Sequence, residues 1–309
     1  METELQRLAK KSFVDVLLDG FKLFKKCYLK LILPFLLFQI ISIVVQVVLL
    51  TDLLLLSYKQ TNDITLIFLY YLTLSLQFLI GMVFSILVMC LVSKFIYKTY
   101  IGVETRFFEE CKKAFNSKLI LVILILGVCM GLGFSPSVLF IPGIIIFGFY
   151  IFLIYTYNSE NVKKNFVSET KSISKGSFWN TIFIAAIFLI LGFLIDLVYR
   201  TYLFNILFLE TFNAVIYFRW LVNRNYLMLI FYEIITNLPS MFLAPLFICL
   251  LTPLFSRCKA RYELGSKYNS TKEQPYAREA LIQENKSLKQ NPITQKSPWE
   301  LKIQQSKNQ

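Results

Sequence analysis

Five long stretches of this chain contain no charged side chain, and they limit its possible folds more than any other feature. They are residues 31–51, 64–93, 119–159, 176–195 and 234–256 of the 309-residue sequence. About 20 apolar residues in a helix cross the hydrocarbon core of a bilayer, which is about 30 Å thick. Each stretch is therefore long enough to cross a membrane. The third, with 41 residues, is long enough to cross it twice.

Turn-forming residues divide this third stretch. Pro136, Pro142 and Gly143 lie within it, and proline lacks a backbone donor while glycine admits a positive φ. We therefore expect an all-α polytopic membrane protein with six transmembrane helices, arranged as three hairpins that are each preceded by an interfacial amphipathic helix. The expected spans are residues 31–51, 66–93, 119–137, 141–157, 177–197 and 232–256.

The segment 198–231 has two interpretations. Residues 201–218 are largely apolar and would be long enough for a seventh span. That span would place Glu210 inside the bilayer, at a cost of at least a few kcal/mol, and it would put the basic C-terminal tail outside. An external, interfacial or re-entrant segment avoids both consequences.

Lysine and arginine are distributed unevenly between the segments that flank the six spans. The first, third, fifth and last of these segments hold 28 of the 32 basic residues, and the three others hold 4. Positive charge stays on the cytoplasmic side of membrane proteins. We therefore expect a multi-pass protein of the cell membrane with cytoplasmic N- and C-termini. The formal net charge of +13 then indicates contact with anionic lipid headgroups, and we expect no nucleic-acid partner.

Composition divides the chain into three regions. Residues 1–30 form a cytoplasmic amphipathic segment, residues 31–265 the six-helix membrane domain, and residues 266–309 a basic cytoplasmic tail. The tail is rich in Lys, Gln, Asn and Ser and buries little apolar surface, so we expect it to be disordered. Alternatively, it docks a soluble protein partner. The sequence does not predict an oligomeric state.

A basic amphipathic segment precedes the first, third and fifth expected spans. Such segments lie in the headgroup plane of a bilayer. Their aromatic and aliphatic positions, spaced as one face of a helix, include Phe13, Leu17, Phe21, Phe24 and Tyr28, then Phe107, Phe108 and Phe115, then Phe166, Ile173 and Phe178. The ends of the second and sixth spans also match, because Lys94 and Gly102 correspond to Arg257 and Gly265. We interpret the pattern as three copies of one unit, although basic flanks are general in membrane proteins.

Two short motifs resemble a known family. One is Phe140-Ile141-Pro142-Gly143-Ile144, and the other is Lys171-Ser172-Ile173-Ser174-Lys175-Gly176-Ser177-Phe178-Trp179. Together they resemble the glycerophosphoryl diester phosphodiesterase membrane domain family of six-helix integral membrane proteins, over about residues 10–268. The resemblance implies the membrane fold without the catalytic phosphodiesterase domain, because the chain has no histidine for the metal site of that domain.

We find no residue set that indicates catalysis, a metal site or a cofactor, and we expect the protein not to be an enzyme. Intramembrane hydrolases need paired carboxylates, a Ser/His couple or a His-rich site, and the apolar stretches contain none of these. The candidate functional residues are instead basic residues beside the spans, which attract anionic lipid. We call them the basic ring: Lys25, Lys26, Lys112, Lys113, Lys163, Lys164, Arg257 and Arg261, with Lys30 and Lys259 beside them.

These features favour a non-catalytic role in membrane organisation or lipid homeostasis, through contact with the cytoplasmic leaflet. The alternative is a transporter or permease-like protein for a small molecule or lipid. Pro239, Pro245 and Pro253 interrupt the sixth span, and broken helices expose backbone groups to ligands in many transporters. Asp196 and Glu233 are the carboxylates that such a path would use.

Overall fold

The computed structural model describes residues 4–59, 63–133, 141–158, 165–199, 201 and 214–273. Most of these residues are helical, and no strand occurs among them. In chain order the helices are α1 (Glu4–Lys10), α2 (Phe13–Lys59), α3 (Asp63–Tyr100), α4 (Phe107–Ala114), α5 (Lys118–Val122), the π-helix η1 (Ile123–Cys129), α6 (Met130–Gly133), α7 (Ile141–Tyr150), α8 (Leu153–Thr156), α9 (Phe166–Ser174), α10 (Phe178–Val198), α12 (Ala214–Val222) and α13 (Tyr226–Glu273).

Within the described ranges, four helices are long and apolar enough to cross a membrane. They comprise Phe13–Leu56, Ile67–Tyr100, Phe178–Val198 and Tyr226–Gly265, and they correspond to the first, second, fifth and sixth expected spans. Helix α10 exposes large apolar side chains such as Phe183, Leu189 and Phe193. Soluble proteins rarely expose so extended an apolar surface, so this surface is typical of a helix that faces lipid.

The third and fourth expected spans form shorter helices than the sequence predicted. Residues 118–133 form a helix that is π-helical in its middle, and the remainder of the expected span, 134–137, lies outside the described residues. The apolar stretch Ile141–Thr156 is below the length of a full span, and α7 and α8 are separated by the turn at Ile151 and Phe152. The arrangement of six spans in three hairpins therefore remains a prediction.

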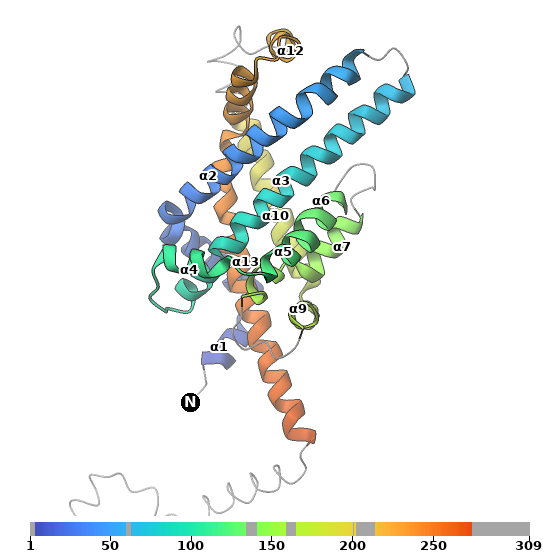
Figure 1. Ribbon diagram of the computed structural model, residues 1–309. Coiled ribbons are helices and arrows are strands. Elements are labelled where there is room, and N and C mark those ends of the chain that lie inside the picture. Colours follow the sequence, from blue (N-terminus) through green and yellow to red (C-terminus); the bar gives the residue numbers. More distant parts are fainter. Residues whose placement is uncertain are drawn as a thin grey trace, which may run out of the picture. The chain divides into compact units, whose positions relative to one another are not determined.

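Helices α2 and α3 run side by side in opposite directions (Figure 1). At one end, Lys11 Nζ lies 3.0 Å from Tyr100 Oη, and Lys30 Nζ lies 5.6 Å from the centre of the Phe95 ring. We call this the basic end. At the opposite end, α12 packs on α2 around the buried residues Leu55, Leu221 and Leu229.

The segment 198–231, for which the sequence allows two interpretations, reaches this opposite end of the hairpin. Residues 202–213 lie outside the described part of the chain. The nine residues of α12 are too few for a span, and the turn that follows holds Arg224, whose guanidinium lies 2.9 Å from the carboxylate of Asp52. The described part of the segment is thus a short helix packed on the end of the α2–α3 hairpin.

The first expected interfacial helix is not a separate element. Residues 13–28 continue without a break into the first span, because α2 is one helix of 47 residues that includes Pro34. Part of its first turns is buried in the protein, where Gly20 packs so closely on α13 that an added Cβ would meet Leu250 Cδ2 at 2.8 Å. Part of the apolar face of this segment is therefore used for packing against another helix, not for contact with the membrane surface.

The interfacial helix expected before the fifth span also packs against protein. Helix α9 precedes α10 as predicted, but Phe166 is 9% exposed and Ile173 is 3% exposed, and α9 packs on α7 and α8. Its apolar face is covered by protein, so the prediction that this face lies in the headgroup plane is wrong for α9.

The chain divides into two compact units, Met1–Ala260 and Arg261–Gln309. The boundary lies inside α13, five residues before the boundary expected from composition. Residues 266–273 of the expected tail are helical as the end of α13. Residues 274–309 lie outside the described residues, so the disorder predicted for them remains a prediction.

Candidate functional site

The described members of the basic ring belong to three helices. Lys25 and Lys26 lie on α2 and Lys112 and Lys113 on α4, and all four are exposed, while Arg257 on α13 is half-buried. Lys163 and Lys164 lie outside the described residues. Arg261 is exposed and begins the second unit of the chain.

The last turns of α3 bring the α2 and α4 members to one end of the molecule. Phe95 of α3 contacts both neighbours, since Lys30 lies over its ring and the Phe107 ring meets it edge-on, with 5.0 Å between the ring centres. Lys25, Lys26, Lys112 and Lys113 therefore lie on helices that meet at the end of α3. No lipid contact follows from this alone.

Glu110 attaches α4 to α3. Its side chain is 3% exposed, and its Oε1 lies 2.9 Å from Lys98 Nζ and 3.4 Å from Lys113 Nζ. Burial alone would raise the pKa of this carboxyl, but hydrogen bonds and charges from Lys98 and Lys113 outweigh that effect and hold the pKa below its ordinary value. Glu110 is therefore charged at neutral pH and fixes the position of Lys98.

A second network attaches the N-terminal segment to the same end. Lys11 Nζ donates hydrogen bonds to Asp19 Oδ2 and Tyr100 Oη, and Tyr100 Oη donates to Asp19 at 3.1 Å. Burial alone would lower the pKa of Lys11, but these partners raise it above its ordinary value. The network joins the start of α2 to the last residue of α3.

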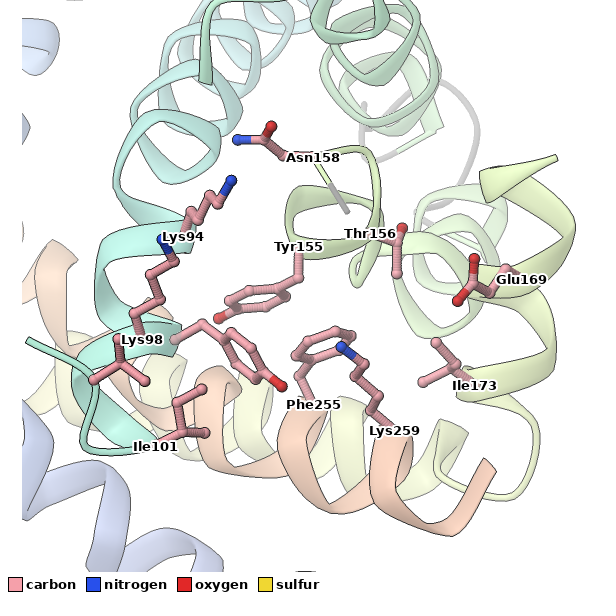
Figure 2. Close-up of a pocket in the computed structure, with 12 residues that line it drawn as sticks. Lys94, Lys98, Ile101, Tyr155, Thr156, Asn158, Glu169, Ile173, Phe255 and Lys259 are labelled. Carbon is pink, nitrogen blue, oxygen red and sulfur yellow. The ribbon is translucent and has the colours of Figure 1, made fainter. Parts of the chain in front are cut away.

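A pocket of about 320 Å³ lies between α3, α8, α9 and α13 (Figure 2). Lys94 and Lys98 reach it from α3, Lys259 reaches it from α13, and Glu169 of α9 lies on the facing side. Its other polar and aromatic lining residues are Tyr97, Tyr155, Thr156, Asn158 and Phe255. All of these residues belong to the first unit of the chain.

An aromatic layer supports the pocket. The rings of Tyr155 and Phe255 are stacked, with centres 4.5 Å apart and planes at 11°, and Tyr97 meets Phe255 edge-on at 5.5 Å. Tyr155 Oη donates to the Ile248 carbonyl at 3.2 Å and lies 2.9 Å from Thr252 Oγ1. These contacts cross from α8 to α13 and fix the relative positions of the two helices at this level.

The end of α3 shapes the rim of the pocket. Gly102 has a φ of +79°, a conformation that glycine adopts without steric cost, and it reverses the chain directly after the helix. The Val103 N–H then donates to the Lys98 carbonyl at 2.9 Å, which satisfies one of the free carbonyls of the last turn. This reversal places Ile101 and Val103 at the pocket.

The sequence prediction missed two of the three lysines of this pocket. Lys94 and Lys98 were not among the candidate residues, whereas Lys259 was placed beside the basic ring. A signal was present, because Lys94 and Lys98 are four residues apart and share one face of a helix. The sequence also showed that the ends of the second and sixth spans match, but not that they lie side by side.

The opposite end carries the carboxylates considered for a transport path. Glu233 Oε1 accepts a hydrogen bond from Tyr217 Oη at 3.4 Å, and its Oε2 accepts one from Asn237 Nδ2 at 3.2 Å. Asp196 is half-buried on α10, and Arg200, four residues later, lies outside the described residues. Glu233 therefore joins α12 and α13, which is a structural role. No group of three or more Cys, Asp or Glu side chains in the described ranges is arranged to hold a metal ion.

Comparison of the chain with protein-family models, with curated proteins and with solved structures finds no match in any of the three. The resemblance to the glycerophosphoryl diester phosphodiesterase membrane domain family therefore remains a prediction from two motifs.

Proposed function

We propose that the protein is an integral membrane protein with six spans and cytoplasmic termini, which organises lipids by holding anionic headgroups of the cytoplasmic leaflet at its basic end. The role is non-catalytic. Juxtamembrane lysines are each worth about 1 kcal/mol of attraction to an anionic membrane surface, and the basic end gathers several of them.

The single observation that supports this proposal best is the outer face of α4. Phe108 of α4 and Phe115, the residue that follows the helix, are 82% and 64% exposed, and the exposed Lys112 lies between them at steps of four and three residues. Glu110 and Ala114 lie on the other face and are buried. An exposed face that combines aromatic rings with lysine is typical of helices that lie at a membrane surface.

An exposed tryptophan at the start of α10 also supports the proposal that this end of the molecule lies at the membrane surface. Trp179 is exposed directly after the Gly176 turn, and tryptophan is enriched where helices leave the hydrocarbon. In this proposal Trp179 and the outer face of α4 mark the cytoplasmic headgroup layer.

The test measures lipid enrichment around the purified protein. The protein is reconstituted into nanodiscs with equal amounts of an anionic and a neutral phospholipid, and the retained lipids are quantified by mass spectrometry. We expect the wild type to retain anionic lipid in excess. The changes Lys25→Gln, Lys26→Gln and Lys112→Gln together should reduce the excess, by roughly 3 kcal/mol in total.

The matched control is at the opposite end, where Arg219→Gln removes an exposed positive charge from α12. It should leave the anionic excess unchanged, because the proposal places this end at the other leaflet. Equal retention of both lipids by the wild type, or an undiminished excess in the triple variant, would contradict the proposed function.

A further inference from the structure

We propose that the corner between α12 and α13 is a second membrane contact, which lies in the interface between headgroups and acyl chains of the leaflet opposite the basic end. Its partner is the phospholipid bilayer. The corner comprises α12, the turn at residues 223–225 and the first turn of α13 at residues 226–229. The choice of leaflet rests on the proposed function, which places the basic end at the cytoplasmic headgroups, but the interfacial position does not.

One side of the corner is buried in the protein and the other is apolar and exposed. Leu221 of α12 and Leu229 of α13 are each 1% exposed and pack with Leu55 of α2, where α12 lies beside the first turns of α13 (Figure 1). Val222 and Leu227 do not belong to this cluster and are 51% and 76% exposed. Because α2 and α13 are candidate membrane spans, this apolar surface is continuous with surfaces that face lipid.

The turn between the two helices is polar. Asn223, Arg224 and Asn225 are exposed, and the ion pair of Arg224 with Asp52 is open to the surroundings, with side chains 61% and 59% exposed. Charged groups are costly at the centre of a bilayer, whereas exposed apolar side chains gain by leaving water. The interface between hydrocarbon and water suits both kinds of group, as it does for interfacial helices.

Backbone hydrogen bonds fix the angle between the two helices. Arg224 has a φ of 51°, and the N–H groups of Arg224 and Asn225 donate to the carbonyls of Leu221 and Trp220 at 3.1 and 2.9 Å, which is a Schellman motif. Asn225 Oδ1 then accepts from the Met228 N–H at 3.3 Å and caps the start of α13. The outward side chains of the corner are therefore held in place before they meet lipid.

The length of α2 places the corner at the level of a membrane surface. Lys30 lies at the basic end and Leu55 lies in the cluster beneath the corner. They are 25 residues apart on one helix, which corresponds to about 38 Å at about 1.5 Å per residue, and Pro34 lies near the Lys30 end. A bilayer is about 30 Å thick in its core and about 40–45 Å with both interfaces. With Lys30 in the cytoplasmic headgroup layer, the corner therefore reaches the opposite interface.

Spin labels on the full-length protein in phosphatidylcholine vesicles measure the depth of the corner. Cys111→Ser and Cys129→Ser remove the two native cysteines that are not buried. Single labels are then attached at Val222→Cys, at Leu227→Cys and, as the matched control in the polar turn, at Asn223→Cys. Power saturation compares the collisions of each label with oxygen, which concentrates in hydrocarbon, and with a water-soluble nickel chelate.

The labels at Val222→Cys and Leu227→Cys should collide more with oxygen than with the nickel chelate, at a depth of about 5–10 Å, and the label at Asn223→Cys should show the reverse. Nickel collisions in excess at all three positions would place the corner in water. Protection from both reagents would indicate a protein occupant, such as a second copy, and a depth at the bilayer centre would indicate a crossing. Each of these three results overturns the proposal.

Folding is checked by the melting temperature in detergent, and Met228→Cys, which is 37% exposed, is the second α13 position if Leu227→Cys melts below the wild type. None of the labels lies at the basic end. The retention of anionic lipid in nanodiscs and the depth of the corner are therefore separate results, and either can fail without the other.

Discussion

Glu110 is nearly buried, yet two lysines keep its carboxylate charged. Its pKa in the folded protein lies below the ordinary value of 4.5. The ionised form therefore stabilises the fold above pH 4.5, and this contribution is lost as the pH falls through the folded pKa. Glu110→Gln should lower the free energy of unfolding by about 1–3 kcal/mol at pH 7, and the difference from wild type should shrink below pH 4.5.

Thermal unfolding in detergent between pH 7 and pH 3 checks this expectation. The matched control is Glu109→Gln, because Glu109 belongs to an exposed pair with Arg106 and such pairs contribute about 0–1 kcal/mol. A difference between wild type and Glu110→Gln that is the same at pH 7 and pH 3 would show that the charge of Glu110 does not stabilise the fold.

Single residues also show where reasoning from the sequence stops. The abundance of lysine beside the spans singled out Lys25, Lys26, Lys112 and Lys113, which are exposed, but their contact with lipid stays a prediction. It did not indicate the pocket at Lys94 and Lys98, because the pocket depends on contacts between α3 and α13, about 160 positions apart in the sequence. Tyr97 and Phe255 are in contact, and no periodicity within one helix indicates such a pair.

At the scale of elements, the α6–α7 pair depends on two glycines that lie against each other. A Cβ added to Gly133 would meet the backbone nitrogen of Gly143 at 2.6 Å. Backbone cannot rotate away as a side chain can, so the two helices would have to separate. We expect Gly133→Ala to destabilise the protein by about 1–3 kcal/mol, as overpacking does in other cores.

Melting temperature in detergent measures this effect, and Gly81→Ala is its control. A Cβ on Gly81 meets the flexible end of Gln46 at 3.6 Å, which is an ordinary contact, and alanine favours helix. Gly81→Ala should therefore be neutral or stabilising. An equal response to the two changes would mean that the Gly133–Gly143 approach does not hold α6 and α7 together.

Helix ends were less predictable than helix positions. Gly102 and Gly265 occupy matching places in the sequence, yet Gly102 has a φ of +79° and ends the helical run of α3, whereas α13 passes through Gly265 to Glu273. The contacts decide the difference, because the chain after Gly102 must turn to bring Glu110 of α4 to Lys98 of α3. The third and fourth expected spans illustrate the same limit, since charge-free length predicts a crossing but not a π-helical turn or a break.

At the scale of the whole first unit, the described charges differ between the two ends of the α2–α3 hairpin. Lysines gather where α2 begins and α3 ends, and the Asp52–Arg224 pair lies where α2 ends and α13 begins. The sequence indicates this difference between the ends, because successive long helices run in opposite directions and their basic flanks therefore alternate between the two ends. It was not sufficient to decide whether the segment from α5 to α8 crosses the membrane, because length alone does not distinguish a short span from a re-entrant pair.

Reporter fusions in a bacterial host decide that question. With six spans and cytoplasmic termini, alkaline phosphatase should be active when fused after Asn62 or Ser137 and inactive when fused after Val103 or Gln309, because the enzyme folds only outside the cytoplasm. The positive charges support this outcome, since the segments around Val103 and after the sixth span are basic. Fusions after Asn62 and Val103 flank α3, which is a full-length candidate span, and they calibrate the assay. Activity after Asn62 without activity after Ser137 would leave α5 to α8 on the cytoplasmic side and reduce the protein to four spans, with the same orientation of both termini.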